Sequence, residues 1–331
     1  MGSSTSVKAA PHFQHTSDVV IERGWYDTAG SETMIGTRID GTTVADDFTV
    51  RLGIRRKPAL KRAARRLCAC FAGAVAAMLL AGPPVGLAAS GVNLLPHVAR
   101  YNLNRHHADI ASGIAAVKGS MEVRFEISCD GFRVEQYLGF RLLSDDENQL
   151  EHLAYISSFE DADGRGFWFN TKTYEDRKLT EEIGGRAALE DSGGGNARYS
   201  LPSKAVEPLP KGTLFPIRHL RAIISAAKAG QKSVRHTVFD GSTRENPFEI
   251  STFIGTGNQE SEKHFGALRD VKQWPVRLAY FPVGAVNLTP RFQMSANLYE
   301  NGVIGNMIYD YGNFAIGVEL DEVEALPKPE C

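Results

Sequence analysis

The sequence predicts a mainly β protein, built from antiparallel strands with one packed helix. Three observations carry this prediction. Apolar and polar residues alternate in several runs after residue 98, a tight-turn signal separates two runs near the C-terminus, and a single segment has helical spacing. The chain has 331 residues, of which 43% are hydrophobic, so it can bury a large core.

Residues 1–54 are predicted to be a disordered extension. They are rich in Ser, Thr, Gly and Asp and show no sustained helical or strand period. Such a segment cannot bury enough apolar surface to offset the entropy lost on ordering.

Residues 55–89 have the three parts of a secretory signal peptide. Basic residues from Arg55 to Arg66 precede an apolar stretch from Leu67 to Ala81, and small residues follow the Gly-Pro-Pro that ends it. The alternative is a transmembrane anchor, but the stretch falls short of the roughly 20 residues that span a bilayer. We therefore expect cleavage, export to the periplasm and no membrane span in the mature protein.

The position of this signal is unusual, because export signals normally begin close to the initiator methionine. We expect the working start to lie downstream of Met1, at Met34 or another start codon, in preference to a functional extension. The predicted organisation is thus an extension over 1–54, a signal over 55–89 and one β domain over 90–331.

The cysteine positions predict one disulfide. Cys68 and Cys70 lie inside the signal, so only Cys129 and Cys331 remain after cleavage. An even pair in an oxidising compartment is expected to be bonded, and the alternative is two free thiols. The bond would close a loop of about 200 residues, worth roughly 5 kcal/mol in the chain-entropy model.

The charge of the predicted domain argues against a nucleic-acid partner. Residues 90–331 carry 26 Lys and Arg against 32 Asp and Glu, a formal charge of −6. Nucleic-acid binding requires a basic face, which this balance does not favour.

Alternation predicts half-buried strands in four places. They cover Met121–Ile127, Gly131–Leu143, Phe167–Thr171 and Phe292–Leu298. Asn301-Gly302 predicts a type I′ hairpin turn, because both residues tolerate positive φ. The segment from Asp161 to Gly166 predicts another tight turn.

Phe215 to Lys228 is the one predicted helix, with apolar residues three and four positions apart. We expect Thr213 to cap it, Pro216 to lie in its first turn and Gly230 to follow its end. The helix should pack on a curved sheet or plug it. No repeat or linker interrupts the chain after residue 90, which favours a single domain.

Motifs for chemistry are weak. The sequence has no nucleophile elbow and no complete dinucleotide loop. Asp161, Asp163 and Gly164 begin like a calcium loop, but Lys172 stands where the bidentate glutamate belongs, so we interpret them as a turn. The histidines are scattered, and His219 on the helix is interpreted as a satisfied surface or groove residue. We therefore expect no catalytic residue, no metal and no cofactor.

Nine short motifs lie in order along residues 92–331. Through these motifs the chain resembles the EipB-like periplasmic cell-envelope integrity family of alphaproteobacteria, which was long described as a domain of unknown function. The motifs are LLPHVARYNL near residue 95, SGI at 112–114, CDGF at 129–132, SSFEDADGRGFWF at 157–169, LPKGTLFPIRHL at 209–220, FDGS at 239–242, YENGV at 299–303, DYGNFAIG at 310–317 and the terminal LPKPEC.

This resemblance implies a β-spiral, which is an antiparallel sheet rolled into an incomplete barrel with one or two packed helices. It also implies a periplasmic location and a family disulfide at Cys129 and Cys331. Ile217 and Arg218 depart from the family pattern at the start of the helix. The resemblance implies no catalytic residues, because none are established for the family.

The leading prediction is a non-enzymatic, monomeric periplasmic protein that supports envelope integrity. It would hold a lipid, a lipoprotein or a protein segment on its concave sheet, with Phe167, Phe169, Phe215 and His219 as candidate groove-facing residues. One alternative is a hydrolase of peptidoglycan or lipid, which would need His219 beside Asp240 and Ser242. The other is a purely structural scaffold.

Overall fold

Within the residues that the structure describes, fourteen strands form one antiparallel sheet. The computed structural model describes residues 91–258, 266–284 and 289–331, so the predictions for residues 1–54 and 55–89 lie outside the described residues. The strand order is β8-β7-β6-β5-β4-β3-β2-β1-β14-β13-β12-β11-β10-β9.

The elements follow one another with few helical interruptions. They are β1 (His97–Ala108), η1 (Ile110–Ser112), β2 (Ile114–Ile127), β3 (Gly131–Ser144), β4 (Gln149–Asp161), β5 (Gly166–Glu175), β6 (Lys178–Leu189), β7 (Gly195–Leu201), β8 (Ala205–Leu209), α1 (Pro216–Lys228), β9 (Ser233–Val238), β10 (Phe248–Ile254), η2 (Gly266–Leu268), β11 (Gln273–Pro282), β12 (Phe292–Tyr299), β13 (Ile304–Asp310) and β14 (Phe314–Ala325).

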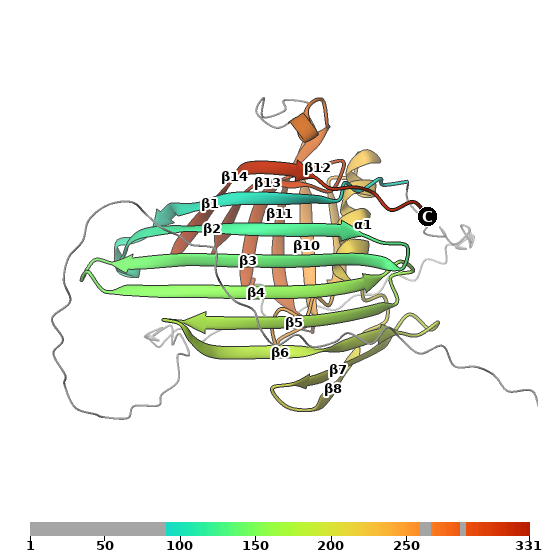
Figure 1. Ribbon diagram of the computed structural model, residues 1–331, viewed down its shortest axis with the longest axis horizontal. Helices are drawn as coiled ribbons and strands as arrows, with labels where there is room; N and C mark the ends of the chain where they lie inside the picture. Colours follow the sequence, from blue (N-terminus) through green and yellow to red (C-terminus); the bar gives the residue numbers. More distant parts are fainter. Residues whose placement is uncertain (1–90, 259–265, 285–288) are drawn as a thin grey trace, which may run out of the picture. The chain divides into compact units, whose positions relative to one another are not determined.

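The first and last strands meet in the middle of the sheet, where Tyr101 of β1 pairs with Leu320 of β14. Strands β8 and β9 are the two edges, and no ladder of the described residues joins them. In Figure 1, β1–β6 lie across the front while β10–β13 run steeply behind them. The sheet is rolled and left open, which confirms the predicted incomplete barrel.

The alternating runs are strands in the structure, and the faces follow the predicted period. The four predicted runs lie within β2, β3, β5 and β12. On β2, Met121 and Phe125 are buried, whereas the intervening residues are only partly buried. Period-two alternation is thus a direct consequence of one face packing on the core.

The hairpin between β12 and β13 is present, but the predicted type I′ turn is wrong. Asn301 is not among the residues with positive φ, whereas Gly302 has a φ of 87°. The N–H of Gly302 donates to the carbonyl of Tyr299 at 2.9 Å, and the N–H of Tyr299 donates to the carbonyl of Val303 at 2.9 Å. This three-residue loop needs only one left-handed residue.

Helix α1 lies where the apolar spacing predicts it, and Pro216 begins it. Thr213 does not cap it, because its hydroxyl donates to the carbonyl of Pro210 at 2.7 Å. The N-cap is Phe215, which provides no side-chain cap. Among the described residues, no helix is long and apolar enough to cross a membrane.

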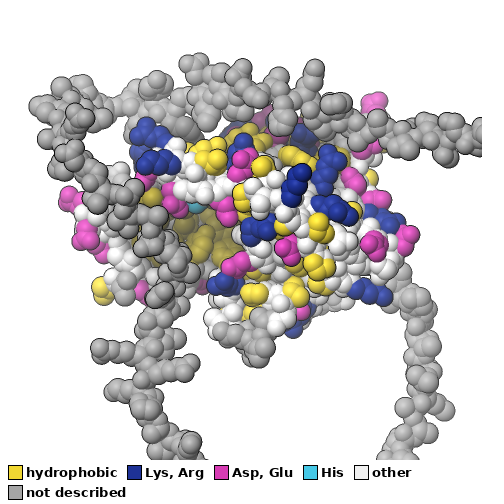
Figure 2. Space-filling view, turned by 90° about the horizontal axis from the view of Figure 1, so that it is seen from below, with side chains coloured by type: hydrophobic (Ala, Val, Ile, Leu, Met, Phe, Trp, Pro, Cys, Tyr) yellow, Lys and Arg dark blue, Asp and Glu magenta, His cyan; other side chains and the backbone are white. Residues whose placement is uncertain are grey.

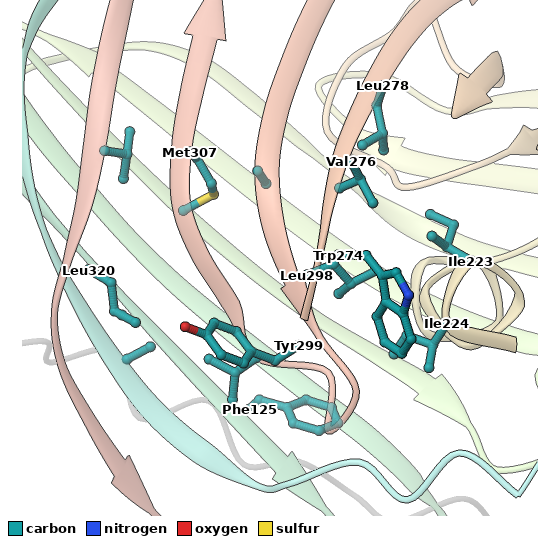
Figure 3. Close-up of a cluster of buried hydrophobic side chains, with 14 of the residues drawn as sticks. Phe125, Ile223, Ile224, Trp274, Val276, Leu278, Leu298, Tyr299, Met307 and Leu320 are labelled. Atoms are coloured by element: carbon teal, nitrogen blue, oxygen red, sulfur yellow. The ribbon is translucent and has the colours of Figure 1, made fainter. Parts of the chain in front are cut away.

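The core lies between the front strands, the back strands and α1. Figure 3 shows Ile223 and Ile224 of the helix facing Trp274 of β11, with Phe125 of β2 and Leu320 of β14 on the other sides of the same cluster. Side chains from the front strands, the back strands and the helix therefore share one apolar interior, and a second buried cluster lies under β5–β8 at the other end of the sheet.

Candidate functional site

Three of the candidate groove residues form an enclosed aromatic cluster. Phe167, Phe169 and Phe215 expose 4%, 1% and 0% of their surfaces. The ring of Phe167 lies 5.1 Å from that of Phe215, and the ring of Phe169 lies 5.3 Å from that of Phe239. These side chains pack on one another, so their apolar character needs no ligand to account for it. A ligand-facing role for them stays a prediction.

His219, the fourth candidate, is buried at 6% exposure beside His236. Their ring centroids lie 5.4 Å apart in an edge-to-face arrangement. His219 Nε2 and His236 Nδ1 are both buried without a hydrogen-bond partner among the described residues, so the interpretation as a satisfied histidine is wrong. Burial, and secondly His236, lower the pKa of His219 to about 3, which keeps it neutral.

The hydrolase alternative requires His219 to reach Asp240 and Ser242. Ser242 Oγ donates to Asp240 Oδ1 at 2.7 Å, and the Ser242 N–H donates to the same oxygen at 2.9 Å. These bonds form a local turn. No hydrogen bond within the described part of the chain joins His219 to either residue, so the base is not placed on the hydroxyl.

A residue that the sequence analysis missed holds the start of α1. Glu160 on the inner face of β4 is only 1% exposed. Its carboxylate accepts the backbone N–H of Ile217 at 2.7 Å and that of Arg218 at 3.0 Å. Those amides belong to the first turn of the helix, which has no intrahelical partner for them. Glu160 therefore supplies the cap from another part of the chain.

Burial and charge act in opposite directions on Glu160. Burial raises the pKa of its carboxyl to about 7, although the two amide bonds and the nearby Arg218 and Arg221 lower it. Arg221 itself lies with its guanidinium 4.6 Å from the ring of Phe132. Burial lowers the pKa of Arg221, and Glu160 opposes that shift. Glu160, Arg218 and Arg221 therefore interact electrostatically at the start of the helix.

The inner face of the sheet also carries apolar side chains that are only partly buried. Strand register places them on the inner face, because Leu138 pairs with Met121 and Tyr309 pairs with Ile316, both of which are buried. We name this region the concave hollow and define it by Leu138, Phe140, Leu142, Tyr280, Met294, Tyr309 and Phe314.

Aromatic rings line much of the concave hollow. Phe292 lies between Tyr280 and Tyr309, with centroid distances of 5.3 and 5.8 Å. Burial raises the pKa of the Tyr280 and Tyr309 hydroxyls, although solvent still reaches part of each side chain. A side chain that is desolvated yet accessible lies in a recess, and Figure 2 shows a recess with a hydrophobic floor.

The concave hollow contains little charge. His152 stacks on Phe140 with centroids 4.8 Å apart, and burial lowers its pKa, although Glu175 opposes the shift. No group of three His, Cys, Asp or Glu able to hold a metal ion occurs in the ranges that the structure describes. Chemically, this surface can hold an apolar group and offers no cluster for metal binding.

Cys129 and Cys331 are joined by a disulfide in the structure, with Cα atoms 5.7 Å apart. This separation is within the range that a disulfide spans, so the pair can form the predicted bond. The tail before Cys331 also contacts the start of the domain, where the Leu326 N–H donates to the Pro96 carbonyl at 2.8 Å.

Known proteins resemble this chain over most of its length. The EipB-like family model matches residues 88–327. The cell envelope integrity protein EipB of Brucella abortus (strain 2308) is 34% identical over 266 residues, which cover 78% of this chain and 94% of that protein.

A solved structure also matches: the crystal structure of a β-barrel-like protein of domain of unknown function DUF1849 from Brucella abortus. It has a TM-score of 0.66 and 33% identity, and the match covers 71% of this chain and 100% of the crystallised chain. A chain of about the length of this β domain therefore folds by itself in that protein. Together, the family model and the similarity over most of the sequence show that the chain belongs to the EipB-like family.

Proposed function

We propose that this protein is a non-enzymatic periplasmic component that supports cell-envelope integrity by holding an acyl chain in the concave hollow. The envelope role is carried over from the name of the relative in Brucella abortus. The observation that supports the ligand is the apolar inner face, whose side chains pack on the core but stay partly exposed. Apolar surface left accessible inside a concave sheet is typical of a ligand site.

A neutral interior suits an acyl chain better than a charged ligand. His152 has a lowered pKa, and the Tyr280 and Tyr309 hydroxyls have raised ones, so all three are uncharged near neutral pH. An ionised ligand placed there would lose its hydration without gaining a counter-charge. The non-enzymatic assignment is supported by the bonding of Ser242 to Asp240 and not to His219 within the described residues.

The chain offers a matched pair of variants for a test. Leu142 lies on the inner face of β3 in register with Val117, and Leu143 is its neighbour on the other face; both are partly buried. The probe is a dansyl-labelled fatty acid added to the oxidised protein comprising residues 90–331. We expect Leu142→Glu to weaken probe binding about tenfold or more, because it places a charge against the chain, and Leu143→Glu to leave binding unchanged.

Competition distinguishes the two sources of an acyl chain. Displacement of the probe by phosphatidylglycerol would indicate a lipid ligand, and displacement by a triacylated lipopeptide alone would indicate a lipoprotein. If the wild-type protein does not bind the probe, or if both leucine variants bind it equally, the concave hollow is not an acyl site.

A further inference from the structure

A second surface, on the outer face of the sheet, carries unpaired cations beside exposed apolar groups. Cross-strand register aligns Trp168 of β5 with Arg186 of β6, Arg186 with Arg198 of β7, and Arg198 with Val206 of β8. Directly opposed residues share a face and strands are about 4.8 Å apart, so this row spans roughly 14 Å. We name it the outer row.

The outer row borders a shallow groove of about 810 Å³. Lys204 also lines the groove, and none of the residues that line it is acidic. Trp168 and Val206 expose 39% and 54% of their surfaces, so the groove presents apolar groups at both ends of the arginine pair. The strands that carry it run to the free edge of the sheet at β8, at the bottom of Figure 1.

Two other cations in this part of the chain have acidic partners. Lys172 of β5 lies 3.3 Å from Glu182 of β6, and Arg165, just before β5, lies 2.6 Å from Asp191. By contrast, Arg186, Arg198 and Lys204 form no ion pair with any described residue. Two arginines directly opposite on adjacent strands repel one another, so this arrangement costs stability unless an anion lies between them.

The cations are also unexpected from the overall balance of charge. Residues 90–331 carry a formal charge of −6, yet the charged residues that line the groove are all basic. Because these basic residues gather on one face of an acidic domain, they attract anions to that face only.

We propose that the outer row docks the protein on a membrane surface that contains anionic phospholipids. Arginine pairs readily with phosphate oxygens, and tryptophan favours the headgroup region of a bilayer. Val206 adds an apolar contact beside it. An acidic protein segment would neutralise Arg186 and Arg198 but leave Trp168 and Val206 in water, whereas a lipid surface satisfies all four.

Docking by the outer row goes beyond the proposed function and uses the opposite face of the sheet from the concave hollow. The two can therefore fail independently. A variant of the outer row should bind the dansyl fatty acid normally, and Leu142→Glu should dock on vesicles normally.

Vesicle sedimentation tests this docking with the oxidised protein comprising residues 90–331. At low salt, it should sediment with equimolar phosphatidylglycerol and phosphatidylcholine but not with phosphatidylcholine alone. Each basic residue near such a surface contributes about 1 kcal/mol, so the double variant Arg186→Gln and Arg198→Gln should lower the partition coefficient about 30-fold. The matched control is Lys232→Gln with Arg277→Gln, which removes two exposed cations that form no ion pair with described residues.

Trp168 provides a second measurement. Trp274 is buried at 3% exposure, so brominated acyl chains should quench mainly Trp168 on docking, and Trp168→Phe should abolish that quenching. Equal sedimentation with neutral and anionic vesicles would overturn the proposal, as would unchanged docking of the double glutamine variant. Binding of poly-glutamate through Arg186 and Arg198 without vesicle binding would assign the surface to an acidic protein segment instead.

Discussion

The carboxylate of Glu160 accepts the backbone N–H of Ile217 at 2.7 Å, which fastens the start of α1 to strand β4. The two residues are 57 positions apart, and one buried side chain does what a local cap normally does. Because α1 also contributes Ile223 and Ile224 to the core, this contact links the helix to both the front strands and the shared interior.

Replacement of Glu160 by glutamine should destabilise the protein. The amide keeps one acceptor oxygen but turns an N–H₂ group toward one of the two backbone amides, which then loses its partner. We expect a loss of about 1–3 kcal/mol in the free energy of unfolding, measured by urea titration at pH 4.5, where the folded protein keeps the proton on Glu160 and its hydroxyl oxygen can still accept a hydrogen bond. Glu151→Gln, on the exposed face of the same strand, is the control and should change stability by less than about 0.5 kcal/mol.

The Glu160 carboxyl should also make the free energy of unfolding depend on pH. Its pKa is about 7 in the folded protein and 4.5 in the reference state, so the folded protein retains a proton that the unfolded chain releases. The stability that this contributes is full below pH 4.5 and is lost as the pH rises through 7. The stability difference between wild type and Glu160→Gln should therefore shrink between those values, and a constant difference would contradict the assignment.

His219 should give stability the opposite pH dependence. Its pKa is about 3 in the folded protein against 6.5 in the reference state, so the unfolded chain binds the proton first. The stability from neutral His219 is present above pH 6.5 and is lost progressively as the pH falls toward 3. Between pH 6.5 and 5, wild type should lose about 1–2 kcal/mol relative to His219→Leu, measured by urea titration at each pH.

A core variant of the same helix separates this effect from general destabilisation. Ile224→Val should lower stability by about 0.5–1.5 kcal/mol at every pH, because it removes a methyl group and no titrating group. Its curve should run parallel to wild type. A His219→Leu curve that also runs parallel to wild type would show that His219 titrates normally in the folded protein.

The sequence predicts those parts of the fold that depend on local pattern. The alternation in β2 and β3 is visible because one face of each strand packs on the core, and the apolar spacing of α1 is visible for the same reason. The predicted cap of α1, Thr213, is wrong, and Glu160 could not be predicted in its place, since Glu160 and Ile217 are brought together only by the rolled sheet. The sequence did contain one signal for Glu160. The period-two pattern of the strand places it on the inward face together with Ser158, where it needs a hydrogen-bond partner.

The candidate site shows the same limit. Phe167 and Tyr309 are both aromatic residues on the inner face of a strand, so their sequence patterns are equivalent. Phe167 is enclosed because Phe215 and Phe239 pack on it, whereas Tyr309 keeps part of its surface exposed. Which inner-face residue meets another side chain depends on the curl of the sheet, and that curl has no local signature.

Gly241 should tolerate no side chain. Its φ is +66°, and a Cβ there would lie 2.4 Å from the ring of Phe169, which is enclosed and cannot move aside. Gly241→Ala should therefore cost about 2–5 kcal/mol, from the left-handed backbone and the collision together. Thermal and urea unfolding would measure this loss.

Gly212 is the matched control for that variant. Its φ is +85°, but nothing lies within 4 Å of an added Cβ. Gly212→Ala should cost only the backbone contribution, about 1–2 kcal/mol. Adding Phe169→Leu to Gly241→Ala should recover part of the loss caused by the collision. Equal costs for the two alanine variants would show that the ring of Phe169 accommodates the new methyl group.

Cys331→Ala should lower stability in oxidised protein only. The disulfide with Cys129 closes a separation of 202 residues, and removing it restores freedom to the unfolded chain. We expect a loss of about 2–5 kcal/mol in the free energy of unfolding, measured by urea unfolding of residues 90–331 without reductant.

With reductant, wild type and the variant should unfold at the same urea concentration, because neither then has the bond. The variant keeps both residues of the tail contact, Leu326 and Pro96, so the substitution itself removes only the covalent link. Identical unfolding of oxidised wild type and the variant would show that Cys129 and Cys331 remain free thiols.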